Sequence, residues 1–163
     1  MRTRKVPDTV QPWKPNVTVA AVAHRDGAFL MVREQSLRGP VINQPAGHLE
    51  RGESLEQAVR RETLEETGWT FEPRSVVGVY LWRSPENGVT YLRVCFAGIV
   101  IGHDPERELD EGILEPVWLN LTALRESRAE HRSPLVMRCI EDFLGGNAYP
   151  LELLHHCVDM DRV

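Results

Sequence analysis

The chain has 163 residues, of which 42% are hydrophobic, and a formal net charge of −5, so its size suits one domain with a sizeable core. The acidic balance and the lack of a dense stripe of lysine and arginine argue against a nucleic-acid polymer as partner. Its three cysteines are widely spaced and form no CxxC pair, which argues against a disulfide framework or structural zinc site and favours a cytoplasmic protein. No apolar run reaches transmembrane length, so no membrane partner is expected.

The first residues, "MRTRKVPDTVQP", are basic but are interrupted by prolines, and no apolar segment of a signal peptide follows them. We therefore predict a flexible arm over residues 1–12. Residues 13–163 are predicted to form a single domain, because no internal repeat or linker divides them. Both a monomer and a homodimer remain open.

Two apolar, β-branched runs flank Asp26-Gly27, a dipeptide typical of tight hairpins. They predict paired strands at residues 17–24 and 28–34. The next segment, "SLRGPVINQPAG", is expected to be a loop with a short extended piece at residues 41–43. A helix is then predicted over residues 55–67. A capping box, "SLEQ", precedes it, and "TGW" places a glycine where a left-handed residue ends a helix.

The second half of the chain predicts another hairpin, in which "SVVGVYLWR" and "TYLRVCFAGIVIG" flank the turn "SPENG". A polar loop, "HDPERELDEG", precedes a short strand, "ILEPVWLN". Helices are expected in "LTALRESRAE" and in "SPLVMRCIEDFLGG", which should begin at Ser133-Pro134. The apolar face of the second should comprise Leu135, Met137, Ile140 and Leu144. The final "YPLELL" is expected to pack back on the domain.

Strands on both sides of one helix, followed by further helices, indicate a mixed β-sheet sandwiched between helices. The fold class is therefore α/β or α+β.

The helix predicted at residues 55–67 has an unusual apolar face. At about 100° per residue, one stripe of its surface contains Leu55, Ala58, Val59, Glu62, Glu65, Glu66 and Trp69. The opposite face holds Glu56, Gln57, Arg60, Thr63 and Thr67. The second half of the stripe that should face the sheet is thus acidic, and amphipathicity alone does not explain it.

Three carboxylates within about one helical turn repel one another, and burial raises their pKa values unless a counter-charge is present. A divalent cation supplies that charge, and oxygen ligands select Mg²⁺ or Mn²⁺. The alternative is a solvated acidic helix in which Arg60 and Arg61 pair with neighbouring acids. An EF-hand fits less well, because "ERGESLEQ" lacks the alternating oxygen ligands of that loop.

The same segment, "GHLERGESLEQAVRRETLEETGW", resembles the signature of the Nudix hydrolases. The matching positions are Gly47, Glu53, Arg61, Glu62, Glu65, Glu66, Gly68 and Trp69. Thr63 departs from the signature, since it is less apolar than the residue usually found there. The stretches "WKPNVTVA", "NQPAGHLE" and "HRSPLVMRCIEDFLGGNAYPLELL" extend the resemblance, to a phosphatase branch of the family, over roughly residues 13 to 154.

The resemblance implies a Nudix fold and assigns roles to the motif residues. Glu62, Glu65 and Glu66 are implied as metal ligands, with the carbonyl of Gly47 as a further ligand. Arg61 is implied to orient acids of the motif.

The general base stays open between Glu53, inside the motif, and Glu111, in the loop before the last strand. Glu115 is a third acid near that strand. It can equally be a residue at the rim of the site that takes no part in catalysis.

The substrate-binding residues are expected on strands and loops that face the helix. Arg33, Arg83 and Arg93 are candidates for phosphate binding, and Trp82 and Tyr91 for stacking on a ring. Two further candidates are named from their positions: His48, beside the motif glycine, and Arg132, before the last helix. His155-His156 is better explained as a solvated pair than as a metal site.

By resemblance, the small phosphorylated substrate is a nucleoside di- or triphosphate, or an organic pyrophosphate of the thiamine pyrophosphate type, and phosphate is released. Cleavage of ADP-ribose or dinucleotide pyrophosphates is the alternative within the enzyme class. A ligand-sensing module without hydrolysis is less favoured, because a pure binder has no need of unpaired carboxylates at core positions.

Overall fold

The computed structural model describes residues 12–157, so nearly all of the arm predicted at residues 1–12 lies outside the described residues. The strands and helices follow one another as β1 (Asn16–Arg25), β2 (Ala28–Ser36), β3 (Gly39–Asn43), β4 (Ala46–His48), α1 (Leu55–Thr67), β5 (Trp69–Arg83), β6 (Thr90–His103), β7 (Ile113–Asn120), α2 (Leu121–Glu126), η1 (Arg128–Glu130), α3 (Leu135–Leu144) and η2 (Leu151–Leu153). None of the helices within the described range combines the length and the hydrophobicity that crossing a bilayer requires.

The first hairpin forms as predicted, between β1 and β2. Asp26 and Gly27 both have positive φ angles, of 51° and 80°, as a two-residue turn that matches strand twist requires. His24 pairs with Phe29 across this turn. The two strands then diverge, and the rest of β1 pairs with β4 and β6 instead.

The strands form a mixed sheet in the order β3-β2-β1-β6-β5, with β4 also paired to β1 and β7 to β2. β1 and β6 are parallel, whereas β5 and β6 form the predicted second hairpin. The segment expected to be mainly a loop is more ordered than predicted. Its extended piece begins at Gly39, and β4 follows it, because both find pairing partners in β2 and β1.

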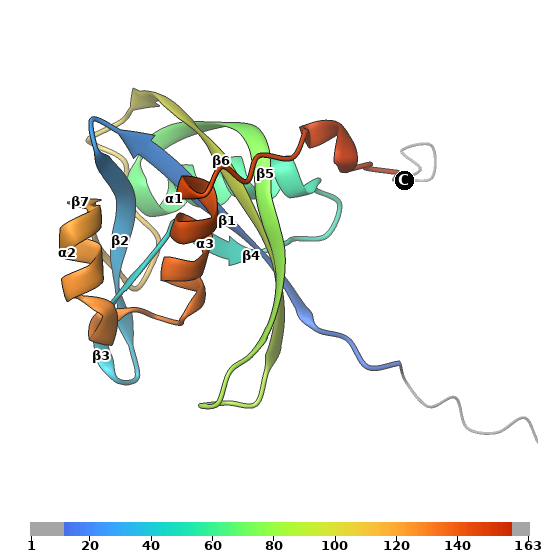
Figure 1. Cartoon of the computed structure of the whole chain (residues 1–163), viewed down its shortest axis with the longest axis horizontal. Helices are drawn as coiled ribbons and strands as arrows, with labels where there is room; N and C mark the ends of the chain where they lie inside the picture. The colour runs from blue at the N-terminus through green and yellow to red at the C-terminus, as the bar shows by residue number, and fades with distance from the viewer. Residues whose placement is uncertain (1–11, 158–163) are drawn as a thin grey trace, which may run out of the picture.

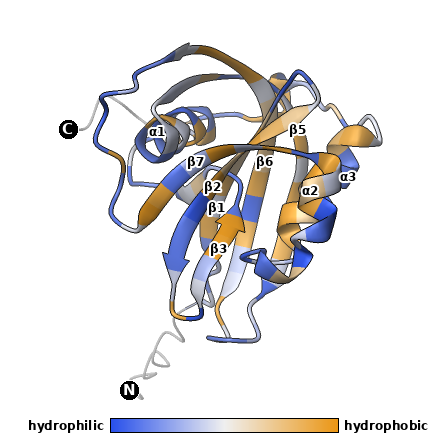
Figure 2. Cartoon of the chain, turned by 90° about the vertical axis from the view of Figure 1, so that its left-hand side faces the viewer, coloured by the Kyte–Doolittle hydropathy of each residue, from blue (hydrophilic) through white to orange (hydrophobic). Residues whose placement is uncertain are grey.

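Helices cover the sheet on both sides (Figure 1), as predicted. Residues of β1 alternate between the two cores: Val19 and Ala21 pack with Val59 of α1, whereas Ala20 and Val22 pack with α3. Figure 2 shows hydrophobic residues along the central strands, between α1 on one side and α2 and α3 on the other. This alternation makes β1 the strand that connects both cores.

Helix α1 spans Leu55–Thr67, the predicted bounds, and Ser54 and Gln57 form the predicted capping box. Gly68 ends it with a φ of 70°. The predicted polar face was partly wrong, because Thr63 and Thr67 are buried. Their hydroxyls donate to the carbonyls of Val59 and Thr63 at 2.7 and 2.5 Å. Four strands, β1, β4, β5 and β7, contact α1, so more than one stripe of the helix is enclosed.

Helix α3 is assigned from Leu135, slightly later than predicted, and the Ser133 hydroxyl accepts a hydrogen bond from the Leu135 amide at 3.3 Å. Val136, Cys139 and Ile140 are fully buried. The prediction for Leu144 was wrong, since it is 48% exposed. It is the last residue of the helix.

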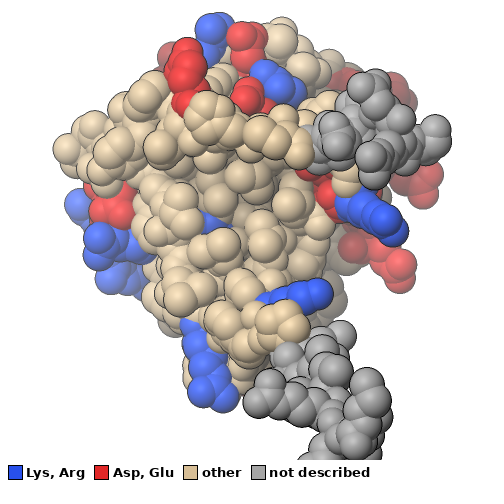
Figure 3. Space-filling view, turned by 90° about the vertical axis from the view of Figure 1, so that its right-hand side faces the viewer, with Lys and Arg blue, Asp and Glu red and all other residues tan. Residues whose placement is uncertain are grey.

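The segment after α3 returns to the sheet. Tyr149 exchanges two backbone hydrogen bonds with Val76 of β5, each of 2.8 Å, and Leu151 and Leu154 pack against the core on the α1 side. The described part of this segment thus lies at the outer edge of β5, on the right in Figure 1. Figure 3 shows that side of the molecule, where uncharged atoms form a broad area with charged side chains around its border.

Candidate active site

The loop through β4 lies directly against the acidic half of α1. Gly47 is in contact with Glu62, and a Cβ at this position would overlap the Glu62 carboxylate. The amide of Ala46 donates to Oε2 of Glu66 at 2.9 Å. A side chain at position 47 would therefore displace the Glu62 carboxylate from its place beside the β4 backbone.

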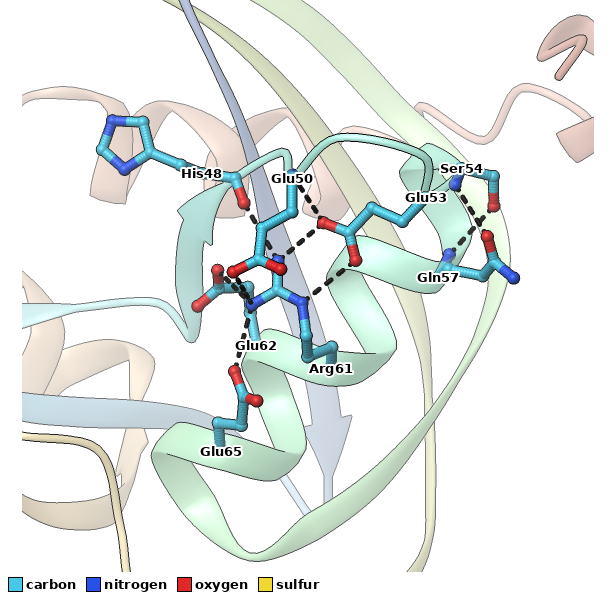
Figure 4. Close-up of polar contacts among 8 residues, drawn as sticks. All are labelled: His48, Glu50, Glu53, Ser54, Gln57, Arg61, Glu62 and Glu65. Carbon is cyan, nitrogen blue, oxygen red and sulfur yellow. Dashed lines mark hydrogen bonds and ion pairs between the residues drawn. The ribbon is translucent and has the colours of Figure 1, made fainter. Parts of the chain in front are cut away.

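Arg61 organises the motif acids (Figure 4). Its Nε and Nη2 atoms donate to the two carboxylate oxygens of Glu53, at 3.0 and 2.7 Å. Its Nη1 atom donates to Glu62 at 2.8 Å and to Glu65 at 3.0 Å. Nη2 also donates to the carbonyl of His48 at 3.0 Å. One guanidinium thus joins the loop before α1 to two acids of the helix, in the bidentate geometry that arginine favours.

Two carboxylates of α1 are buried with little compensation. Glu62 is 8% exposed and Glu66 is 7% exposed. Burial raises the pKa of both groups, and the pKa of Glu66 rises to about 9 although the Ala46 amide opposes the shift. For Glu53 the opposite holds, since its hydrogen bonds with Arg61 lower its pKa. Arg61 offsets the burial of Glu62 only in part, and no cation opposes the burial of Glu66 in the part of the chain that the structure describes.

Asp110 joins this acidic cluster, and the sequence reasoning missed it. Carboxylate oxygens of Glu62, Glu65 and Asp110 lie within 4.8 Å of one another, close enough to hold one metal ion. The amide of Asp110 donates to the carbonyl of Glu65 at 3.0 Å, which fixes the loop on the helix. The segment "LDEGI" contains two adjacent acids, and its spacing does not indicate which of them turns toward α1.

A cavity of about 490 Å³ opens at the acidic cluster. Its lining contains most of the residues proposed from the sequence: Gly47, His48, Arg61, Glu62, Glu65, Glu66, Trp82, Tyr91, Arg93 and Arg132. Glu53 and Glu111 do not line it. Glu111 is exposed and belongs to the loop that also carries Asp110. Glu53 is paired with Arg61.

The cavity is also lined by polar residues that no sequence pattern indicated. Glu34 of β2 accepts hydrogen bonds from Asn43 and Arg132, each of 3.3 Å, and burial raises its pKa. The hydroxyl of Thr18 and the side-chain carbonyl of Asn43 are buried and have no hydrogen-bond partner among the described residues. These side chains come from three different strands, so only the tertiary fold places them together.

One wall of the cavity is aromatic. Trp82 and Tyr91 are cross-strand partners on β5 and β6, and their rings stack with centroids 6.0 Å apart and planes at 23°. The ring of His48 lies 6.3 Å from that of Tyr91. Nearby, the buried Arg93 donates to the side-chain carbonyl of Gln44 at 3.3 Å.

Two of the proposed phosphate-binding arginines lie elsewhere. Arg33 points away from the cavity lining and pairs with Glu115 and Glu130, each at 3.5 Å. Arg83 donates to the carbonyl of Gly88 within its own hairpin, at 3.3 Å. Both occupy strand positions whose direction depends on the sheet register, which the local pattern did not specify.

Comparisons with known proteins identify the family of the chain. The NUDIX domain profile matches residues 12–139. The chain is 37% identical over 143 residues to the phosphatase NudJ of Escherichia coli (strain K12), a match that covers 87% of this chain and 92% of that protein. A solved NUDIX hydrolase from Nitrosomonas europaea is 50% identical, with a TM-score of 0.87 over 88% of this chain and 98% of that one.

A more distant structure shares the fold. The NUDIX domain of Shewanella oneidensis NrtR, solved in complex with ADP ribose, is 18% identical and superposes with a TM-score of 0.67, covering 85% of this chain and 92% of that one.

The chain belongs to the Nudix hydrolase family. Within that family it is similar to a phosphatase over most of its length. Arg61, Glu62, Glu65 and Glu66 of α1 line the cavity. The same four residues belong to the sequence motif that resembles the Nudix signature.

Proposed function

We propose that this protein is a Mg²⁺- or Mn²⁺-dependent hydrolase of phosphoanhydride bonds. Its substrates are nucleoside di- or triphosphates, or small organic pyrophosphates of the thiamine pyrophosphate type, and phosphate is released. One observation carries the proposal: four carboxylates, those of Glu62, Glu65, Glu66 and Asp110, line one cavity, and Arg61 pairs with only two of them, Glu62 and Glu65.

The chemistry of these residues fits a divalent cation. The oxygens of Glu62, Glu65 and Asp110 are close enough for one ion, and all-oxygen ligands select Mg²⁺ or Mn²⁺. Glu66 and the backbone carbonyl of Gly47 are the further ligands that we propose. When bound, such an ion neutralises charge on phosphate oxygens and activates water.

The residues of the chain itself supply position and charge. Arg61 holds Glu62 and Glu65 in fixed rotamers through hydrogen bonds of 2.8 and 3.0 Å. Arg93 and Arg132 line the cavity, which supports our proposal that they bind substrate phosphate oxygens. The stacked Trp82 and Tyr91 rings offer a flat surface for a base or pyrimidine ring. His48, beside Tyr91, can hydrogen-bond the same part of the substrate.

The positions of the acids favour the loop before β7 as the source of the general base. Both oxygens of Glu53 are engaged by Arg61, which lowers its pKa and makes it a weak proton acceptor. Glu111 remains a candidate because it shares a loop with Asp110. Asp110 itself lies at the cavity and is the candidate that the structure adds.

The similarity to the phosphatase NudJ supports release of phosphate rather than cleavage within a dinucleotide. The test is a panel of nucleoside di- and triphosphates, thiamine pyrophosphate and ADP-ribose, assayed with Mg²⁺, with Mn²⁺ and with excess chelator. We expect inorganic phosphate to be released from nucleoside diphosphates, nucleoside triphosphates and thiamine pyrophosphate. We expect no turnover in excess chelator. AMP formed from ADP-ribose alone supports the dinucleotide alternative, and turnover in chelator contradicts the role of the metal.

A further inference from the structure

A second cavity, of about 440 Å³, adjoins the active site. It lies between the β2–β3 turn, the β5–β6 turn, η1 and the start of α3. Its charged lining consists of four arginines and two glutamates, together with one histidine: Arg38, Arg128, Arg132, Arg138, Glu86, Glu141 and His131. We refer to it as the arginine cavity.

The charge of the arginine cavity contrasts with that of its neighbour. The active-site cavity is lined by acids that outnumber its arginines: Glu34, Glu50, Glu62, Glu65, Glu66, Glu86 and Asp110 against Arg61, Arg93 and Arg132. The whole chain carries a net charge of −5. Each of the four arginines has a carboxylate partner: Arg38 pairs with Glu86 at 2.8 Å and Arg132 with Glu34 at 3.3 Å, besides the pairs of Arg128 and Arg138. Two of these partners, Glu34 and Asp142, do not line the arginine cavity, so its surface presents more guanidinium groups than carboxylates.

The arginines retain donors for a ligand. Arg128 pairs with Glu141 through Nη2 at 2.6 Å, and Arg138 pairs with Asp142 through Nε at 2.9 Å. Each pair thus uses one N–H-bearing nitrogen of a guanidinium that offers five N–H donors. Their side chains are 58% and 65% exposed. The existing pairs hold the two side chains in place without exhausting their hydrogen-bonding capacity.

The two cavities share a wall. Trp82, Glu86, Arg132 and Ser133 line both of them. A molecule whose ring stacks on Trp82 can therefore extend into the arginine cavity while its phosphoanhydride remains at the acidic cluster. The volume of the second cavity accommodates part of a substrate rather than a single small ion.

We propose that the arginine cavity binds a second phosphate group of the substrate, at the end of the molecule remote from the anhydride that is hydrolysed. The proposal rests on the proposed function and narrows its substrate class to compounds phosphorylated at both ends. Several arginines suit a phosphate because a planar guanidinium binds its oxygens through two parallel hydrogen bonds.

Binding of inorganic phosphate in excess chelator tests the site without turnover. Without a metal the acidic cavity repels anions, so phosphate should report on the arginine cavity alone. We expect a titration followed by NMR to shift the signals of Arg128, Arg138 and Ser133 in a saturable way. Signals that do not move, or that move without saturation, overturn the proposal.

Matched variants assign the binding to particular side chains. Arg128→Gln and Arg138→Gln should each weaken phosphate binding several-fold. Arg74→Gln is the control, because Arg74 pairs with Glu72 at 3.2 Å and is also 58% exposed, but does not line the cavity. Equal affinity in all three variants contradicts the assignment.

Kinetics connect the site to the substrate. Adenosine 3′-phosphate 5′-diphosphate should have a KM about tenfold lower than that of ADP, as one additional charged hydrogen bond implies, and Arg128→Gln should bring the two KM values together. Phosphate binding without any KM difference shows an adventitious anion site and overturns the proposal. If neither nucleotide is hydrolysed while phosphate still binds at the arginines, the proposed function fails and the anion site stands.

Discussion

Helices α1 and α3 pack against opposite faces of the same sheet (Figure 1), but they bury different kinds of side chain. Helix α3 buries Val136, Cys139 and Ile140 completely. Helix α1 buries Ala58 and Val59 in its first half and then Glu62 and Glu66 in its second half. Helix α3 thus contributes mainly apolar burial to its core, whereas α1 also carries the buried acids of the proposed active site.

The difference has an energetic consequence. Apolar burial on α3 stabilises the fold by about 25 cal/mol for each Å² removed from water. The buried acids of α1 destabilise the metal-free fold when they ionise, because their charge loses its hydration. Changes in α1 should therefore affect activity most, and changes in α3 should affect stability most.

The largest expected effect is on turnover. Glu65→Gln should lower kcat/KM by at least about two orders of magnitude, because it removes a proposed metal ligand and an acceptor for Arg61. The circular dichroism spectrum should not change. Glu56→Gln on the same helix is the control, since Glu56 pairs with Arg60, at 3.8 Å, and does not line the cavity. Comparable activity of the two variants would contradict the role given to Glu65.

On α3 the effect should be on stability. Ile140→Ala should lower the free energy of unfolding by about 2–5 kcal/mol, the range for truncating a buried aliphatic side chain. Leu144→Ala, at an exposed position of the same helix, should change it by less than about 0.5 kcal/mol. Urea unfolding measures both. The specific activity of the folded fraction should stay the same, and a large loss would mean that α3 also supports the chemistry.

The pH dependence of stability sharpens the comparison. The pKa of Glu66 is raised to about 9 by burial, so the folded state binds more protons than the unfolded state between the ordinary glutamate pKa and about 9. The free energy of unfolding of the metal-free protein should therefore fall as pH rises through this window. Glu66→Gln should flatten the profile. A profile that stays equally steep in the variant would show that other groups cause it.

The smallest effect should follow from the loop that faces α1. Gly47→Ala should lower kcat/KM by about tenfold, because the new methyl group displaces the Glu62 carboxylate. The melting temperature should change little, since the clash is with the end of a flexible side chain. Gly102→Ala is the control, because its φ does not lie in the left-handed region and a Cβ there would make an ordinary contact with Oγ1 of Thr70, at 3.8 Å. Full activity of Gly47→Ala would mean that Glu62 tolerates displacement.

Much of the fold could be predicted because its signals are local. The turn at Asp26-Gly27, the capping box at Ser54 and the left-handed Gly68 each depend on a few neighbouring residues. They predicted the bounds of α1 and the first hairpin. The burial of Thr63 could not be predicted in this way, since it depends on strands that enclose α1 from several sides.

The candidate site divides in the same manner. Glu62, Glu65 and Glu66 could be proposed together because a helix places residues three and four positions apart on one surface. Arg61 was proposed from the resemblance to the Nudix signature. Arg33 was proposed for the site, but the register of β2 directs it toward Glu115. Asp110 was missed because its loop position is determined by a backbone contact with Glu65.

By itself, therefore, the sequence determined which residues form α1 and that its inward half is acidic, because helical periodicity and capping are local properties. Only the tertiary structure decided which distant groups complete the site: Asp110 from the loop, Glu34 from β2, and the wall of Trp82 and Arg132 that joins the two cavities. These choices depend on strand register and loop anchoring, which arise from contacts between segments far apart in the chain.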